Sequence, residues 1–168
     1  MTLFSDIPQP KDLVGDEKAE SALRVSLLSA QRALRDKKKS VVILVSGVNG
    51  AGSGEVIRSL GNWLDPRSVR TYAFSRRSQD ERERPLCWRY WMSLPAHGEI
   101  AIYSHAWYTE AVRKYAKQKI TKRNFSRMLG HIQQLESDLT SDGALVLKYW
   151  LHLSAAEQKA RFEELSAN

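Results

Sequence analysis

The chain of 168 residues has a single cysteine, Cys87, so it forms neither an internal disulfide framework nor a zinc site built from cysteines. Its longest apolar runs are far shorter than the ~20 residues that a membrane span needs. Residues 1–16 contain no apolar segment of the kind found in signal peptides. These absences favour a soluble, cytoplasmic protein without a membrane partner.

Acidic residues are also scarce relative to basic ones. The 26 lysines and arginines against 19 aspartates and glutamates give a net charge of +7. This excess favours anionic partners such as nucleotides, polyphosphate, nucleic acid or a membrane surface. No recognised nucleic-acid motif is present, and a cluster of basic residues is as easily a solvated face as a binding site.

The apolar periodicity predicts one α/β domain. A helix is expected over 16–37, followed by strands and helices in alternation, which indicates a three-layer α/β/α fold with a parallel sheet. Residues 1–15 are expected to form an extended arm, and 16–168 the domain. The strands are expected over 40–46, 69–74, 99–103 and 144–151, and the later helices over 56–64, 85–94, 107–117, 121–141 and 154–165.

A glycine-rich loop, Gly47–Glu55, joins the first strand to the helix that follows. Such a loop leaves backbone N–H groups free to converge on phosphate, and the helix start adds the positive end of its dipole. Gly47 and Gly52 have the spacing of the pattern G-x-x-x-x-G-K-[ST], but Ser53 stands where lysine belongs. The loop therefore predicts a phosphate site without its usual cation. The expected contacts are Gly47, Asn49, Gly50, Gly52, Ser53 and Gly54.

A second candidate region is the charged segment 75–84, which follows a strand at the edge where open α/β sheets bind ligands. Two interpretations are open for Arg76, Arg77 and Arg89. They contact phosphate, or they pair with the carboxylates of Asp80, Glu81 and Glu83. The basic residues between 113 and 127 are expected to form a solvated face.

The histidines, the cysteine and the clustered aromatic residues do not indicate a separate functional site. His97, His131 and His152 lack metal-ligand spacing, so no metal site is predicted. His105 is interpreted as structural or exposed rather than as an acid or base, because no carboxylate partner is evident. Cys87 and the aromatic residues Trp88, Tyr90 and Trp91 are expected in the core.

An ordered set of motifs resembles the polyphosphate kinase 2 family, from about Leu23 to Asn168. After the loop these motifs are Asn62–Arg67, Asp80–Pro85, Trp88–Trp91, Leu94-Pro95, Gly98–Tyr103, Trp107–Thr109, Leu147–His152 and Glu157-Gln158. Asp80–Pro85 and Trp107–Thr109 are most similar to the N-terminal copy in two-domain polyphosphate:AMP phosphotransferases. The resemblance implies a P-loop, thymidylate-kinase-like fold and phosphoryl transfer between inorganic polyphosphate and AMP or ADP with Mg²⁺.

The departures from the family pattern concern its catalytic groups. The family's loop aspartate and lysine fall on Asn49 and Ser53, and its aspartate and arginine after the third strand fall on Ser104 and His105. No catalytic group is intact, which puts Mg²⁺ binding in doubt. Family members also continue with a lid and a last strand, whereas this sequence stops at Asn168.

The resemblance and the departures together predict a weak or inactive copy that binds polyphosphate or has a structural role. Its expected partners are polyphosphate, a nucleotide, and either a second polyphosphate kinase 2-like domain or a second copy of the chain. One alternative is an active transferase that uses the arginines between Arg76 and Arg89. The other alternative is a basic nucleic-acid-binding module.

Overall fold

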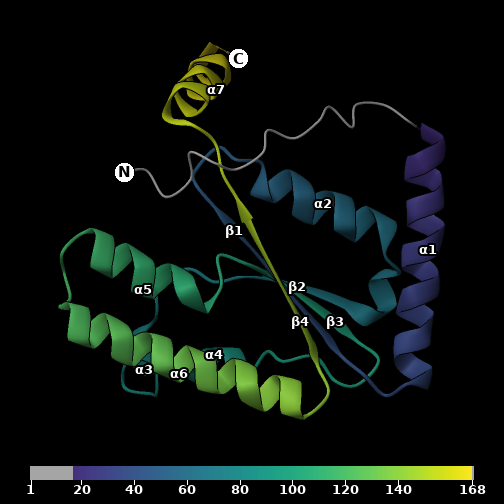
Figure 1. Cartoon of the computed structure of the whole chain (residues 1–168), viewed down its shortest axis with the longest axis horizontal. Coiled ribbons are helices and arrows are strands. Elements are labelled where there is room, and N and C mark those ends of the chain that lie inside the picture. The colour runs from purple at the N-terminus through teal and green to yellow at the C-terminus, as the bar shows by residue number, and fades with distance from the viewer. Residues whose placement is uncertain (1–16, 168) are drawn as a thin grey trace.

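The computed structural model describes residues 17–167, with the side chains of 18–164 (Figure 1). The arm predicted for residues 1–15 lies outside the described residues. The elements in chain order are α1 (Glu17–Asp36), β1 (Val41–Gly47), α2 (Ser53–Trp63), η1 (Pro66–Ser68), β2 (Val69–Ala73), α3 (Gln79–Arg82), α4 (Trp88–Trp91), β3 (Ile100–Ser104), α5 (Trp107–Ala116), α6 (Lys122–Ser141), β4 (Leu145–Leu151) and α7 (Ala155–Ala167).

The strands form one parallel sheet in the order β2-β3-β1-β4. Val41 at the start of β1 is aligned with Ile100 of β3 and with Leu145 of β4. The first five residues of β1 are all buried, which explains why its sequence is apolar without alternation. Because the strands are parallel, the segments that follow their carboxyl ends meet at one edge of the sheet.

Helices cover both faces of this sheet (Figure 1), which confirms the three-layer α/β/α arrangement. On one face, Val41, Ile43 and Val45 pack against apolar side chains of α1 and α2. On the other face, Val42 and Leu44 belong to a cluster with residues of α4, α5 and α6. The alternation of β1 side chains between the two clusters places the glycine loop at the end of a strand that is fixed from both sides.

Local differences from the predicted elements lie between 75 and 94. The segment 75–84 contains the short helix α3, whose capping box joins Ser78 and Glu81 in both directions. The predicted helix over 85–94 is shorter and covers only Trp88–Trp91; beyond its end the Ser93 carbonyl accepts a 2.7 Å hydrogen bond from the Tyr103 hydroxyl. Cys87 and Tyr90 are buried as predicted, but Trp91 is 47% exposed, so its placement in the core was wrong.

The last helix, α7, begins at the predicted capping box. The Ser154 N–H donates to Glu157 Oε2 at 2.8 Å, and the Glu157 N–H donates back to Ser154 Oγ at 3.2 Å. The helix stands beyond the carboxyl end of β4, beside the glycine loop (Figure 1). Among the described residues, no helix combines the length and the apolar character that crossing a membrane requires.

Candidate phosphate-binding cleft

The glycine loop has the backbone geometry of an anion site. Gly50 and Gly52 both adopt φ +83°, a left-handed conformation that favours glycine. Gly52 is the N-cap of α2, and no side chain caps the helix. Within the described part of the chain, the N–H groups of Gly52, Ser53 and Gly54 donate no hydrogen bond. These amides are therefore available to an anion at the helix start.

The beginning of the loop is fixed against β4. The Val48 N–H donates to the Leu151 carbonyl at 3.1 Å. A Cβ atom at Gly47 would overlap that carbonyl oxygen and lie 2.9 Å from Leu151 Cβ. Glycine is thus required at position 47 by the close approach of the neighbouring strand, independently of any ligand.

A cleft of about 800 Å³ opens next to the loop, at the carboxyl ends of the strands. Five of the nine predicted phosphate contacts line it: Gly47, Asn49, Arg76, Arg77 and Arg89. The other four lie in the loop but do not line the cleft: Gly50, Gly52, Ser53 and Gly54. The remaining lining residues are Phe74, Ser75, Arg82, Tyr90, His105, Ala106, Thr109, Glu110, Arg113 and Lys114. Contact of any of these residues with phosphate stays a prediction.

Arg77 and Arg89 already hold the segment 75–84 in its shape. Arg77 donates through Nη2 to the carbonyls of Glu81 and, at 2.9 Å, of Arg84. Arg89 donates through Nη1 to the Ser75 carbonyl at 3.0 Å, and its guanidinium lies 4.5 Å from the centre of the Phe74 ring.

Arg89 also pairs with a carboxylate of the same segment. Its Nε approaches Glu81 Oε1 at 3.1 Å, close enough for an ion pair but poorly aligned for a hydrogen bond. The two interpretations of these arginines therefore do not exclude each other. Arg77 and Arg89 support the cleft wall whether or not they also touch a ligand.

Three other arginines of the cleft are free of such contacts. Arg76, Arg82 and Arg113 are exposed, and none of them has a side-chain hydrogen bond or ion pair with any residue that the structure describes. Lys114 also lines the cleft, where its ammonium lies 2.6 Å from Glu110 Oε1. Unpaired guanidinium groups around a cavity create a positive potential that favours a multiply charged anion.

Arg113 and Lys114 line the cleft, which corrects the prediction of a solvated face at these two positions; the later basic residues are exposed as predicted: Lys117, Lys119, Lys122, Arg123 and Arg127. Arg113 and Lys114 belong to α5, which starts directly after β3 and so lies at the ligand edge of the sheet. Thr109, Glu110 and Arg113 are spaced by three and four and share one face of that helix. Two signals in the sequence could have placed Arg113 at the cleft: the spacing of three and four residues along α5, and the start of α5 directly after a strand. The number of residues that separate Arg113 from the glycine loop was a poor guide.

Two of the four residues at the departures from the family pattern line the cleft, and the other two do not. Asn49 and His105 line the cleft, Ser53 begins α2, and Ser104 ends β3. His105 is exposed and adopts φ +53°, and its N–H donates to the Val45 carbonyl at 3.1 Å. Its left-handed conformation turns the chain from β3 into α5.

The carboxylates near the cleft do not form a magnesium site. Glu81 pairs with Arg89, Glu110 pairs with Lys114, and Glu55 pairs with Arg161. Across residues 17–167 no three side chains of His, Cys, Asp or Glu are grouped so that they could hold a metal ion. Mg²⁺ prefers carboxylates in octahedral geometry, which neutral Ser53 and Asn49 do not supply. The glycine loop itself therefore offers no unpaired carboxylate to this ion.

Comparison with known proteins identifies the family. The family model for polyphosphate kinase 2 matches residues 11–168. The chain belongs to the polyphosphate kinase 2 family. It is 36% identical over 150 residues to a polyphosphate:AMP phosphotransferase of Pseudomonas aeruginosa, and 33% identical to one of Pseudomonas syringae pv. tomato. These alignments cover 89% of this chain but 30% of each relative, so the chain spans about a third of their length.

Solved structures of the same family confirm the fold. A crystal structure of a polyphosphate kinase 2 from Pseudomonas aeruginosa superimposes with a TM-score of 0.82 at 31% identity, over 96% of this chain and 38% of that one. The polyphosphate kinase 2 from Arthrobacter aurescens gives a TM-score of 0.89 at 21% identity, over 100% of this chain and 63% of that one. The α/β fold with a parallel sheet is thus the P-loop kinase-like fold of this family.

Proposed function

We propose that this polyphosphate kinase 2 domain binds inorganic polyphosphate in the cleft and turns it over slowly or not at all. The observation that carries the proposal is a glycine loop with free amides beside three unpaired arginines, while Ser53 replaces the loop lysine. The domain retains the groups that attract an anion, and it lacks the groups that stabilise a transferring phosphoryl group.

The first part of the proposal, that the domain binds polyphosphate, rests on the arrangement of its positive groups. The amides of Gly52, Ser53 and Gly54 are free at the start of α2, behind the loop residues Gly47 and Asn49 that line the cleft, and Arg76, Arg82 and Arg113 line the cleft as well. A guanidinium binds phosphate oxygens in a bidentate manner, and the helix start adds its dipole. A linear polyanion engages several of these groups at once, whereas a single phosphate engages few.

The second part of the proposal, that turnover is slow or absent, rests on the missing charged groups of the site. Phosphoryl transfer is mainly positioning and neutralisation of the transition-state charge. Ser53, Asn49 and Ser104 are all neutral, and loss of one such contact commonly costs about 3 kcal/mol, a hundredfold or more in rate. With no fitting set of magnesium ligands, efficient transfer to AMP is not expected.

Calorimetric titration with medium-length polyphosphate tests binding. We expect saturable binding that weakens about tenfold or more when Arg76 and Arg113 are both replaced by alanine, because two unpaired cations are lost. Arg32→Ala is the matched control, since Arg32 is exposed on α1 and does not line the cleft. If the unmodified chain does not bind polyphosphate, the binding part of the proposal is wrong.

Turnover is tested separately, by formation of ADP from polyphosphate and AMP with Mg²⁺. We expect no product above the blank, with the Pseudomonas aeruginosa polyphosphate:AMP phosphotransferase as the positive control. Comparable rates for the two proteins would favour the active transferase. In that event Arg76→Ala is the informative variant, because Arg89→Ala would also disturb the segment held by Glu81 and Ser75.

The domain bounds, the location in the cell, the nucleotide and the protein partner belong to the same proposal. A domain over 16–168 works in the cytoplasm, with AMP or ADP as the nucleotide and a second polyphosphate kinase 2-like domain or a second copy as partner. Binding of DNA or RNA at moderate salt that polyphosphate does not displace would favour the nucleic-acid-binding module instead.

A further inference from the structure

The net charge of the chain is concentrated in one segment. Residues 111–135 contain seven lysines and arginines and no aspartate or glutamate. Because the whole sequence has 26 basic and 19 acidic residues, the remainder holds 19 of each and is neutral. The segment comprises the second half of α5, the turn after it and much of α6. The excess of +7, which favours anionic partners, thus belongs to this part of the molecule.

The turn between the two helices gathers these cations into one surface. We call the basic surface the five exposed residues Lys117, Lys119, Lys122, Arg123 and Arg127. The ring of Tyr115 stacks on that of Phe125, with centroids 4.5 Å apart, which holds the start of α6 against the end of α5. The Lys119 N–H donates to the Lys114 carbonyl at 2.8 Å, so the turn folds back onto α5. Cations from both helices therefore surround a single turn, at the left of Figure 1.

The basic surface begins where the cleft ends. Arg113 and Lys114 line the cleft, and Lys117 follows them on α5 at spacings of four and three. With a rise of about 1.5 Å per residue, the Lys117 Cα lies only ~6 Å further along the helix than the Arg113 Cα. A chain of phosphates that passes Arg113 therefore meets Lys117 as it leaves the cleft.

Helix stability does not account for these charges. The negative end of the α5 dipole favours Lys117, but Lys122 and Arg123 stand in the first turn of α6, at the positive end of its dipole. The first turns of α2, α5 and α7 carry glutamates instead: Glu55, Glu110 and Glu157. Arg123 and Arg127 are also a like-charge pair at i,i+4, which disfavours a helix.

The side chains of the basic surface have no acidic partner within the protein. None of the five forms a side-chain hydrogen bond or ion pair with a residue that the structure describes. Cations placed against the helix dipole and left unpaired favour an anionic ligand.

We propose that the basic surface is a second binding site for polyphosphate, which holds the part of a long chain that extends out of the cleft. This inference rests on the proposed function, because the cleft supplies the first contact. Polyphosphate carries a negative charge at every unit, so a long chain neutralises cations along the whole path from Arg113 to Arg127. A short phosphate occupies the cleft alone. The basic surface thus makes the affinity depend on chain length.

Nucleic acid fits the basic surface less well than polyphosphate does. Proteins bind single strands by stacking bases on exposed aromatic rings that alternate with cations. The two aromatic residues of the segment 111–135 are Tyr115 and Phe125, and they stack on each other instead.

Calorimetric titration with tripolyphosphate and with medium-length polyphosphate tests the inference. The variant combines Lys117→Ala, Lys119→Ala and Lys122→Ala. We expect it to bind medium-length polyphosphate about tenfold more weakly at low salt, because three cations of the path are lost. Its affinity for tripolyphosphate should not change, since Arg76 and Arg113 of the cleft remain.

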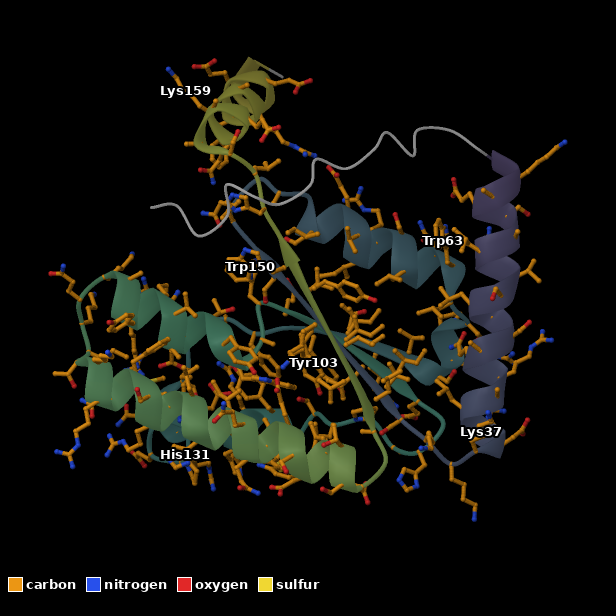
Figure 2. All side chains as sticks on the ribbon, in the orientation of Figure 1. Lys37, Trp63, Tyr103, His131, Trp150 and Lys159 are labelled. Atoms are coloured by element: carbon orange, nitrogen blue, oxygen red, sulfur yellow. The ribbon has the colours of Figure 1, made fainter. Side chains whose placement is uncertain are left out.

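The matched control replaces Lys37, Lys38 and Lys39 by alanine, which lowers the net charge by the same amount. These lysines are exposed after α1, and Figure 2 labels Lys37 on the opposite side of the molecule from the turn between α5 and α6. Equal affinities of the two variants for medium-length polyphosphate overturn this inference and leave the proposal for the cleft standing. If the unmodified chain binds neither ligand, both are wrong.

Thermal denaturation separates a lost contact from a damaged fold. The variant of the basic surface should melt at or above the temperature of the unmodified chain, since Lys122→Ala removes a cation from the first turn of α6. A lower melting temperature would contradict the argument that these charges do not serve stability. Tighter binding of a single-stranded RNA than of medium-length polyphosphate at the same salt would identify a nucleic-acid site instead.

Discussion

Arg161 of α7 lies 3.1 Å from each carboxylate oxygen of Glu55, in the first turn of α2. Gln158, three residues earlier on the same helix face, donates to the Asn49 carbonyl at 2.7 Å. Phe162 approaches Gly50, where a Cβ atom would be 3.7 Å from its ring. One face of α7 thus contacts the glycine loop from Asn49 to Glu55.

Arg161→Ala should loosen α7 with little effect on the rest of the fold. The side chains of Arg161 and Glu55 are 38% and 66% exposed, so we expect a loss below about 1 kcal/mol of global stability. Hydrogen exchange should accelerate in the segment 155–164 and in the glycine loop. Lys159→Ala is the control, because its pair with Glu163 lies within α7. Unchanged exchange in the loop would show that the pair between Arg161 and Glu55 does not hold α7 against it.

Gly47→Ala should destabilise the domain strongly, because the added Cβ meets the Leu151 backbone, which cannot move aside without breaking the β1–β4 ladder. We expect a loss of roughly 2 kcal/mol or more in chemical denaturation, in the range of overpacking. Gly61→Ala is the matched control: Gly61 lies within α2, and a Cβ there meets nothing within 4 Å. That substitution should be neutral or stabilising by up to ~1 kcal/mol. A well-tolerated Gly47→Ala would contradict the close approach.

The fold was predictable from the sequence because its signals are local. The apolar run over 40–46, the stripe of the helix over 121–141 and the capping box at Ser154 each correspond to an element within one or two residues of its observed bounds. Their alternation leaves few topologies other than a parallel sheet. The short extent of α4 was missed; the segment just after it contacts Tyr103, a residue of another element, and the local sequence does not contain such a contact.

The cleft was only half predictable, because its walls come from segments far apart in the sequence. Arg76 and Arg89 were found from their position after β2, whereas Arg113 was assigned to a solvated face. The difference lies in tertiary packing: α5 is held against β3 through buried Trp107, and this brings Arg113 to the cleft. No pattern of charges along the chain contains that information.

Gln31→Leu should cost about 1–3 kcal/mol, because it leaves buried polar groups without partners. Gln31 is 5% exposed and joins α1 to the turn after α2. Its Nε2 donates to the Asp65 carbonyl and to Ser68 Oγ, both at 2.9 Å, and its Oε1 accepts from the Asp65 N–H at 2.8 Å. Gln134→Leu, which removes an exposed bond to Asp138, serves as the control in thermal denaturation. Equal melting temperatures for the two variants would refute the role of Gln31.

Asp65 should titrate far below an ordinary aspartate. Hydrogen bonds from the Arg67 side chain and N–H lower the pKa of Asp65 from 3.8 to about 2. A folded-state pKa below the unfolded value gives stabilisation that is full above about pH 4 and is lost as the pH falls towards 2. Carboxyl NMR titration should show a midpoint near 2, and Arg67→Ala should move it towards 3.8. Arg70→Ala, which removes a pair with Glu99, should leave the midpoint in place.

Ser53→Lys should restore the loop cation and strengthen polyphosphate binding without restoring transfer. Position 53 opens α2 next to the free amides, so a lysine there adds a positive charge where we propose that the loop binds phosphate. We expect affinity to rise about tenfold at low salt and the gain to shrink as salt screens it. Ser59→Lys adds the same charge on the exposed surface of α2 and is the control. Turnover should remain absent, because Asn49 and Ser104 still offer no carboxylate. Appearance of ADP with Ser53→Lys alone would mean that the missing lysine was the one defect of this site.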